Sequence, residues 1–312
     1  MAWGFSPHRH IHAKAWSFLP SAFRQAWQPS PADLLRWATS ADSRKHTDTL
    51  EAARHYLDLD DLPLHSPSFA GTTWANAQEV LTADDSTLSP RRLGVLPWEL
   101  EQAYWRMVAA WSPRDSSAPN LDRINRAAAD FGHYLADAHV PLHTSGNYDG
   151  QRTNQRGIHA LWETQAAEWL LLPENRKSCG PCSDRNVLLY DPVWTPWEVI
   201  LESHELVDDV FLAEKQWREI CQNRGHGFQR RGRTLALLPT PGALAVWDSL
   251  TKSTTWPRLC LASCRIAAGW HAAWLEAGSP RLTATQHIPW WEPWASYLPD
   301  AWQSKLRNWN QP

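Results

Sequence analysis

Two short runs decide the fold: F-G-H-Y-L-A-D-A-H-V-P-L-H at residues 131–143, and G-I-H-A-L-W-E at residues 157–163. In each run a histidine stands four residues before an acid, and the two pairs are His133 with Asp137 and His159 with Glu163. On a helix, residues four apart lie on one face, so each pair projects toward a shared point.

His143, just after Pro141, adds a fifth side chain of the kind that zinc accepts. A catalytic zinc typically takes about three protein ligands and keeps one position open. Five candidates therefore predict a cluster of at least two metals. Such clusters are suited to attack on phosphate esters or amides by a metal-bound hydroxide.

A structural interpretation competes with this one, because a histidine four residues from an acid often forms a surface pair or a satisfied core histidine. Either pair alone would favour that interpretation. Two pairs with His143 between them, interleaved with small and apolar residues, favour the metal interpretation instead.

The residues before the first run predict a long helix. Apolar side chains recur at helical spacing from Leu121 to Ala138, with Asn120 placed to cap the helix and Pro141 to end it. Strand alternation is scarce, so the predicted fold class is all-α, a multi-helix bundle. Further helices are expected at residues 32–39, 97–111, 158–172, 196–224 and 256–276.

Size and composition fit a soluble enzyme with a substantial core. The 312 residues are 43% hydrophobic and include 22 Trp, most of which we expect to pack between helices. We expect a helical zinc hydrolase domain at residues 1–278. The tail at 279–312, which contains Trp290, Trp291, Trp294, Trp302 and Trp309, is expected to pack on this domain, with a lipid-interface anchor as the alternative.

Charge and hydropathy exclude two classes of protein. No apolar run approaches the roughly 20 residues of a membrane-spanning helix, so no integral membrane association is expected. The nearest run, 235–247, is interrupted by Pro239 and Pro241. The net charge of -3 lacks the basic footprint of a duplex-binding protein, so metal ions must supply most of the positive charge for a phosphate substrate.

More candidate ligands lie upstream. The segment W-G-F-S-P-H-R-H-I-H at residues 3–12 contributes His8, His10 and His12, and residues 41–61 contribute Asp42, His55 and Asp58. Each alone would be interpreted as a surface or core residue. The cluster downstream makes them candidates.

With these motifs in order, the chain resembles the superfamily that joins bacterial zinc-dependent phospholipase C with the fungal-type zinc single-strand nucleases. The resemblance spans about half the chain, in the family's order and close to its spacing. It rests on W-G-F-S-P-H at 3–8, A-D-S-R-K at 41–45, H-Y-L-D at 55–58, H-Y-L-A-D-A-H-V-P-L-H at 133–143 and H-A-L-W-E at 159–163.

The resemblance implies three zinc ions with Asp137 bridging two of them. The implied ligand sets are His55, His133, Asp42 and Asp137; His143, His159 and Glu163; and Trp3, His8 and Asp137. Asp48 is the alternative to Asp42. In this family the third zinc is held by the free amino group of an N-terminal Trp, whereas Trp3 follows Met1 and Ala2. A longer precursor cleaved before Trp3 is therefore expected, with a secreted or periplasmic location.

The resemblance also implies hydrolysis of a phosphodiester, with Asp137, Asp42 and Lys45 as the catalytic candidates. A hydroxide between the bridged zincs would attack phosphorus, and Lys45 or Arg44 would add a cationic contact. Tyr56 and Asp58 lie near positions that stack on and hydrogen-bond a base in nuclease relatives, although Tyr56 fits a packing role equally well.

Three functions remain open. Phospholipase C-like hydrolysis comes first because Glu163 resembles the phospholipase branch. A single-strand nuclease is the alternative because D-A-H-V-P-L-H, with His139, resembles the nuclease branch. The third is a non-catalytic binding protein stapled by zinc. The partner is thus a phospholipid or a single-stranded nucleic acid, and the oligomeric state stays open.

The cysteines carry less information. Cys179-Gly-Pro-Cys182 copies a thioredoxin-type motif without the surrounding βαβ pattern, so a local disulfide or two idle thiols is expected. Cys260 and Cys264 fit a helical core, and Cys221 has no assigned role.

Overall fold

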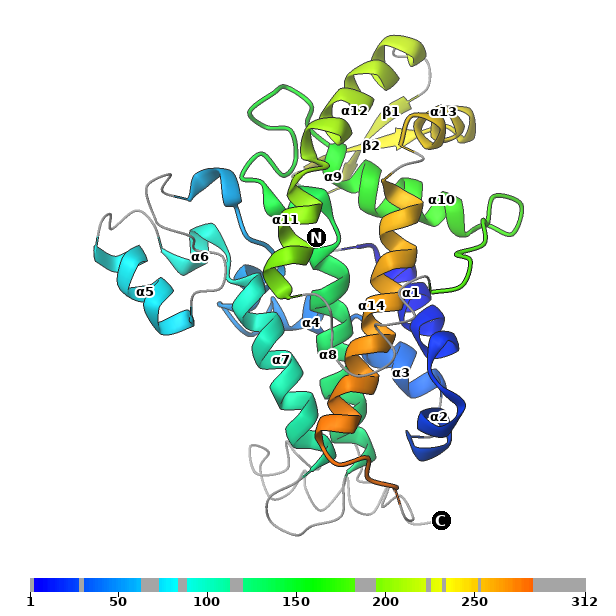
Figure 1. Cartoon of the computed structure of the whole chain (residues 1–312). Helices are drawn as coiled ribbons and strands as arrows, with labels where there is room; N and C mark the ends of the chain where they lie inside the picture. Colours follow the sequence, from blue (N-terminus) through cyan, green and yellow to red (C-terminus); the bar gives the residue numbers. More distant parts are fainter. Residues whose placement is uncertain are drawn as a thin grey trace, which may run out of the picture.

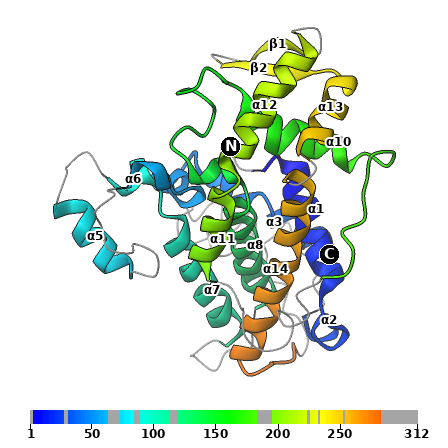
Figure 2. The ribbon, with the colours of Figure 1, turned by 45° about the horizontal axis from the view of Figure 1, so that its top comes forward.

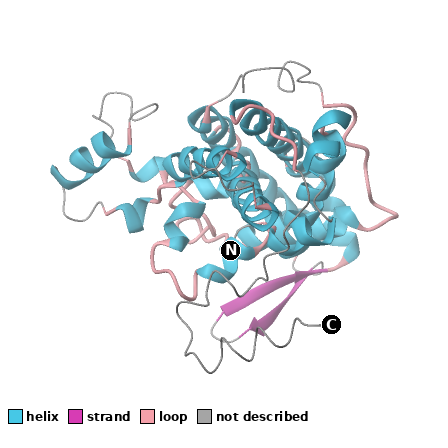
Figure 3. Ribbon diagram, turned by 90° about the horizontal axis from the view of Figure 1, so that it is seen from below, coloured by secondary structure: helices cyan, strands magenta, loops and turns pink. Residues whose placement is uncertain are grey.

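The computed structural model describes residues 3–27, 31–62, 73–83, 89–112, 120–182, 195–222, 226–231, 234–251 and 254–282. This part of the chain is mostly helical, as predicted, with one small hairpin (Figures 1 and 3). The tail predicted at 279–312 lies outside the described residues beyond residue 282. No described helix is both long enough and apolar enough to cross a bilayer.

The elements run in the following order. The α-helices are α1 (Phe5–Phe18), α2 (Ser21–Trp27), α3 (Pro31–Trp37), α4 (Ser40–Arg44), α5 (Trp74–Ala83), α6 (Pro90–Leu93), α7 (Leu96–Trp111), α8 (Leu121–Ala138), α9 (Ile158–Ala160), α10 (Ala167–Leu171), α11 (Pro196–His204), α12 (Val207–Cys221), α13 (Pro241–Thr251) and α14 (Thr255–Glu276). The 3-10 turns are η1 (Glu51–His55), η2 (Leu59–Asp61) and η3 (Pro141–Thr144), and η4 (Leu161–Ala166) is a π-helical turn. Strands β1 (His226–Arg231) and β2 (Thr234–Pro239) pair antiparallel.

Helix α8 is the centre of the bundle. It packs against α7, α14 and α3, while α1 runs along α14 (Figures 1 and 2). The Asn120 side chain accepts a hydrogen bond from the Arg123 N–H, which confirms the predicted cap. Gly269 of α14 lies against α8 so closely that a β-carbon there would come within 2.4 Å of the Phe131 ring. The last two turns of α8 are buried on every side, so its polar residues face protein.

Tryptophan fills much of the core. The indoles of Trp27 and Trp270 meet edge to face with centroids 5.1 Å apart, and Trp27 and Trp111 do the same at 5.8 Å. Burial of such large rings removes much apolar surface from water and stabilises the contacts among α1, α2, α7 and α14. The buried tryptophans are Trp3, Trp27, Trp98, Trp111, Trp162, Trp197, Trp217, Trp247, Trp256 and Trp270.

Several elements differ from the expectation, and helices α2, α5 and α13 are among those that were not predicted. Helix α1 was not predicted, because its buried face mixes His8 and His12 with Ile11 and Ala15 and so hides the apolar period. The hairpin was missed because T-L-A-L-L-P in β2 does not alternate. The single helix expected at 196–224 is two helices, α11 and α12.

Tertiary contacts hold the end of α11 at the break between α11 and α12. Ser203 donates its hydroxyl to the Val199 and Ala138 carbonyls, and His204 Nδ1 lies 3.0 Å from the Thr144 carbonyl oxygen. These bonds tie the end of α11 to the segment that follows α8. The chain then turns at residues 205–206 and begins α12 in a new direction.

The cysteine prediction was wrong. Disulfides join Cys179 to Cys260 and Cys182 to Cys264, so the C-G-P-C loop is strapped to α14 and no Cys179–Cys182 bridge forms. Cys260 and Cys264 are one helical turn apart and present both sulfurs on one face. Local spacing could not reveal a pairing with residues 81 and 82 positions away.

The two disulfides predict an order of stability among cysteine variants of the protein. Replacing all four paired cysteines by serine should lower the free energy of unfolding by about 4 kcal/mol, the chain-entropy value for a closed loop of this size. Removing only Cys179 and Cys260 should cost much less, because the neighbouring bridge still closes the same loop. Urea unfolding measures both changes.

Cys221→Ser is the matched control for this series, because Cys221 is the free cysteine among the described residues. It should leave the urea midpoint unchanged. Peptide mapping that finds Cys179 bonded to Cys182 would contradict the assignment of the straps.

Candidate metal centre

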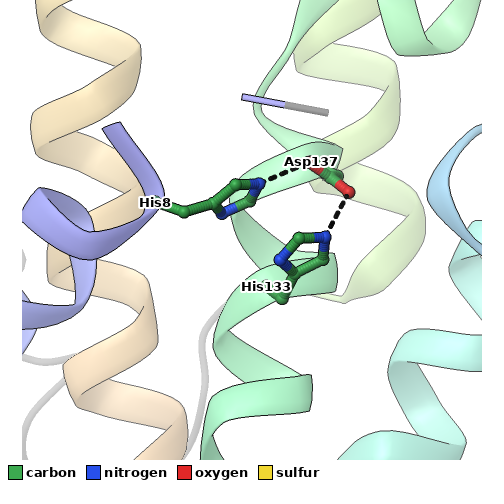
Figure 4. A group of neighbouring side chains, drawn as sticks. All are labelled: His8, His133 and Asp137. Carbon is green, nitrogen blue, oxygen red and sulfur yellow. Dashed lines mark ion pairs between the residues drawn. The ribbon is translucent and has the colours of Figure 1, made fainter. Parts of the chain in front are cut away.

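Asp137 stands at the meeting point of the histidines that the sequence analysis identified on α1 and α8. Its Oδ1 lies 3.3 Å from His8 Nε2, and its Oδ2 lies 3.4 Å from His133 Nε2 (Figure 4). The rings of His8 and His133 stack with centroids 3.9 Å apart. One ligand atom from each of the three residues falls within 4.8 Å of the others, which is a metal-sized group.

A second group shares His133. His55, at the end of η1, places Nδ1 2.7 Å from Asp137 Oδ2 and 3.2 Å from His133 Nε2. Asp42 of α4 places Oδ2 3.9 Å from His133 Nε2. Asp42, His55 and His133 form the second metal-sized group. Asp48, the alternative to Asp42, instead bonds the Leu50 N–H and the Arg54 guanidinium.

The third group lies on the other side of Asp137. His159 Nε2 is 2.8 Å and His143 Nε2 is 3.3 Å from Glu163 Oε2, and the two ring nitrogens are 3.1 Å apart. His143 Nδ1 also lies 4.0 Å from Asp137 Oδ1, which connects this group to the others. The structure therefore brings all eight predicted His, Asp and Glu ligands together.

A π-helical turn sets the position of Glu163. Helix α9 begins after Gly157, whose φ of +94° suits glycine, and the chain passes directly into η4. Such π-turns inside helices are frequent at functional sites because they rotate one side chain relative to its neighbours. Here the turn carries Glu163 toward His143, which comes from a separate 3-10 turn.

Trp3 is anchored beside the groups. Its indole N–H donates to the Ala136 carbonyl at 2.7 Å, and its ring lies 4.8 Å from that of Trp162. The next residue, Gly4, donates its N–H to the Glu163 carbonyl at 3.3 Å. The start of the described chain is thus held between α8 and η4. Its two bonding partners are the carbonyl of Ala136, the residue before Asp137, and the carbonyl of Glu163 itself.

The donor atoms fit a bound metal. Several are buried and make no aligned hydrogen bond within the described structure, even where a partner is near: His8 Nδ1 and Nε2, Asp137 Oδ1, His143 Nδ1 and Glu163 Oε2. Buried polar atoms are normally satisfied, so such a group calls for a ligand. Converging imidazole nitrogens and carboxylate oxygens are the donors that zinc takes.

Protonation states favour ligation in most of the cluster. Burial lowers the pKa of His133 and His143 and lowers that of His159 to about 3, which leaves these imidazoles neutral. Burial opposes ionisation of Asp137, but His133 and the hydrogen bonds from His55 and His8 hold its pKa well below the ordinary value. Neutral imidazole and ionised carboxylate are the metal-binding forms.

Two groups titrate differently. Burial raises the pKa of Glu163 to about 7. Burial acts to lower the pKa of His55, but its hydrogen bonds to Asp137 and Glu51 raise it overall. A metal bound through either residue would displace a proton, so its affinity would rise with pH.

A cavity of about 470 Å³ opens beside the groups. It combines two tyrosines, two cations and one carboxylate with the exposed side of the ligands. Its lining residues are Lys45, Ala52, His55, Tyr56, Asp58, Arg92, Leu142, His143, Tyr148 and His159. Both proposed substrate residues, Tyr56 and Asp58, thus face this cavity.

The two basic residues of A-D-S-R-K separate. Lys45 lines the cavity and pairs with Asp42 at 2.7 Å. Arg44 turns away, with its guanidinium 3.0 Å from Asp130 Oδ1 and 3.0 Å from the Tyr134 hydroxyl. Arg44 is therefore engaged in a separate network, and the cavity lining favours Lys45 as the cationic contact.

Loop contacts fix the cavity rim that carries Asp58. Asp60 accepts hydrogen bonds from the Gly146 N–H at 2.7 Å and the Ser145 hydroxyl at 2.9 Å, and Arg152 bonds Asp61. These bonds join the rim to the turn that carries Tyr148. Burial, with the nearby negative charges of Asp61 and Asp60, raises the pKa of Asp58 to about 7.

The other candidate histidines lie elsewhere. His12 is buried with Nδ1 2.8 Å from the His8 carbonyl oxygen, His10 is near Trp256, and His139 lies between the Leu135 carbonyl and Arg265.

Sequence reasoning missed three residues of the site: Arg92 and Tyr148 in the cavity, and Glu51 behind His55. Glu51 precedes His55 by four residues, which was the available signal.

No family model matches the chain, and no curated protein matches it.

Asp137→Ala tests the shared role of this carboxylate. Because Asp137 contacts members of all three groups, its loss should lower the bound zinc by more than one equivalent per chain. Elemental analysis after dialysis against excess zinc measures the change. Asp122→Asn, on the first turn of α8, is the control and should retain the wild-type zinc content.

Proposed function

We propose that the protein is a zinc-dependent phosphodiesterase. The observation that carries the proposal is the convergence of three metal-sized groups on Asp137 beside an open cavity that also presents Lys45 and Arg92. Zinc bound there would supply Lewis acidity toward a phosphoryl oxygen and activate the attacking water at neutral pH. The resemblance of the motifs to the phospholipase C and single-strand nuclease superfamily supports the same reaction.

The chain's own residues have separate roles in this proposal. His55, His133, Asp42 and Asp137 would hold one zinc; His143, His159 and Glu163 would hold a second; and His8, Asp137 and, after cleavage before Trp3, the freed Trp3 amino group would hold a third. Lys45 offsets negative charge on the bound phosphoryl group. Asp137 keeps the sets in fixed relation, and the apolar core around α8 keeps its carboxylate rigid.

Phospholipase C-like hydrolysis remains the first candidate because of the motif around Glu163. A specific observation favours a single-strand nuclease as the second. Tyr56 and Tyr148 both line the cavity, and Tyr148 is 48% exposed, so a planar base can stack on it. Asp58 lies on the same wall, and its carboxyl with a pKa of about 7 can donate as well as accept a hydrogen bond.

The two disulfides support an oxidising compartment, so we propose a secreted or periplasmic location.

Side-by-side assays test the function. Zinc-loaded protein should hydrolyse phosphatidylcholine or single-stranded DNA, and a chelator should abolish that activity. Duplex DNA is the control substrate and should react much more slowly, because its bases cannot reach the cavity wall. Zinc-loaded protein that cleaves neither substrate, yet unfolds at a lower temperature without zinc, would instead support the non-catalytic binding protein.

Asp58 gives a pH signature. Its folded-state pKa of about 7 exceeds the ordinary value of 3.8, so the folded protein holds a proton that the unfolded chain releases. The contribution of Asp58 to stability is therefore present below about pH 4 and is lost as pH rises toward 7. Above pH 7 its negative charge also repels an anionic substrate.

Asp58→Asn removes both effects. For the active substrate, KM of the wild type should rise several-fold between pH 6 and 8, and KM of the variant should change less. Steady-state kinetics across this range measure the difference. Parallel pH profiles of KM in the two proteins would contradict a neutral Asp58 in the substrate complex.

A further inference from the structure

Glu51 is a fully buried carboxylate with an unusual number of donors around it. Arg44 donates from Nε at 3.2 Å and from Nη2 at 3.3 Å, and Arg54 Nη1 donates at 2.6 Å. The Tyr134 hydroxyl donates to Oε1 at 2.6 Å. These four contacts fix the carboxylate in position and balance its charge.

The same Oε1 faces the outer edge of a proposed zinc ligand. It lies 3.5 Å from His55 Nε2, while Nδ1 on the inner edge of that ring lies 2.7 Å from Asp137 Oδ2. The ring edge of Tyr134 packs on His55 with centroids 5.4 Å apart. His55 is therefore held with Nδ1 toward the ligand group and Nε2 toward Glu51.

An imidazole that binds a metal through one nitrogen carries its proton on the other, and an acceptor for that N–H fixes both the tautomer and the ring orientation. Within the described residues, Glu51 Oε1 is the acceptor placed to do this for His55. Because Arg44 and Arg54 already balance the charge of Glu51, its effect on His55 is one of orientation more than of added negative charge.

We propose that Glu51 is a positioning residue of the metal centre, which orients His55 for ligation through Nδ1. The inference rests on the proposed zinc site. It adds a residue outside the ligand sets and assigns the arginines and tyrosine around Glu51 a purpose: they hold the acceptor still. Loss of the acceptor should weaken zinc binding at the set that contains His55.

Glu51→Gln is the informative variant. A carboxylate offers about four acceptor positions, whereas the amide offers two and adds an N–H₂ group. The remaining oxygen cannot serve Arg44, Arg54, Tyr134 and His55 together. The contact to His55 is the longest of these, so it should be lost first.

Glu99→Gln is the matched control. Glu99 belongs to the same network, since its carboxylate pairs with Arg54 at 3.3 Å and also with Arg106. The ion pairs of Glu99 in the described structure are with Arg54 and Arg106, so this variant removes one carboxylate charge beside Arg54 and leaves the proposed acceptor in place. Thermal unfolding of both variants reports the structural cost of that loss.

Zinc affinity and the tautomer of His55 are the measurements. Competition against a chromophoric chelator should show the weakest site about 10–100-fold weaker in Glu51→Gln, a loss typical for removal of an outer-shell partner, and near wild type in Glu99→Gln. Nitrogen-15 NMR of the zinc-loaded wild type should show His55 ligated through Nδ1 and protonated at Nε2.

Wild-type zinc affinity in Glu51→Gln, or ligation of His55 through Nε2 in the wild type, would overturn the inference. The NMR result decides the matter even if the variant fails to fold. These outcomes are separate from the proposed function: zinc-loaded wild type that hydrolyses no phosphodiester contradicts the function and leaves the role of Glu51 intact.

Discussion

The carboxylate of Asp137 is the interaction on which the arrangement of the site depends. It is completely buried on α8, and its two oxygens divide the neighbouring imidazoles: Oδ1 faces His8 and His143, whereas Oδ2 faces His55 and His133. These histidines come from four different elements. A buried charge of this kind is costly unless it is compensated, so the elements that carry the histidines must meet at α8 for the fold to tolerate it.

The apolar core makes this meeting point rigid. Close contact between α8 and α14, permitted by Gly269, and the edge-to-face indoles of Trp27 and Trp270 hold the bundle with little room for adjustment. Donors placed by such a scaffold keep their distances without a ligand, which is the requirement for a site that must be ready before substrate arrives. The strap of α14 to the Cys179–Cys182 loop extends the same constraint to the segment after α10.

What could be predicted from the sequence follows the range of each interaction. The cap at Asn120, the length of α8 and both His–acid pairs depend on neighbours within a few residues, and spacing alone indicated them. Convergence of His8 and His55 on α8 is tertiary, so only the resemblance to a family suggested it. The disulfide partners and the ion pairs of Arg44 are also tertiary. For the cysteines the local interpretation was wrong, and for Arg44 the spacing could not distinguish it from Lys45. Glu51 was missed because, in sequence, an acid between two arginines looks like part of an exposed charged segment, and its burial is visible only in the fold.

Charge balance connects the site to the proposed substrate. The ligand sets contain only three carboxylates, those of Asp42, Asp137 and Glu163, and histidine binds a metal as the neutral imidazole. Three divalent zinc ions would therefore leave the loaded centre with an excess of positive charge in a protein whose net charge is -3. Lys45 and Arg92 add to this excess at the cavity wall. Among possible substrates, an anionic phosphodiester would be bound most favourably by such a field, because solvent screens the attraction between opposite charges less inside the cavity than at the open surface.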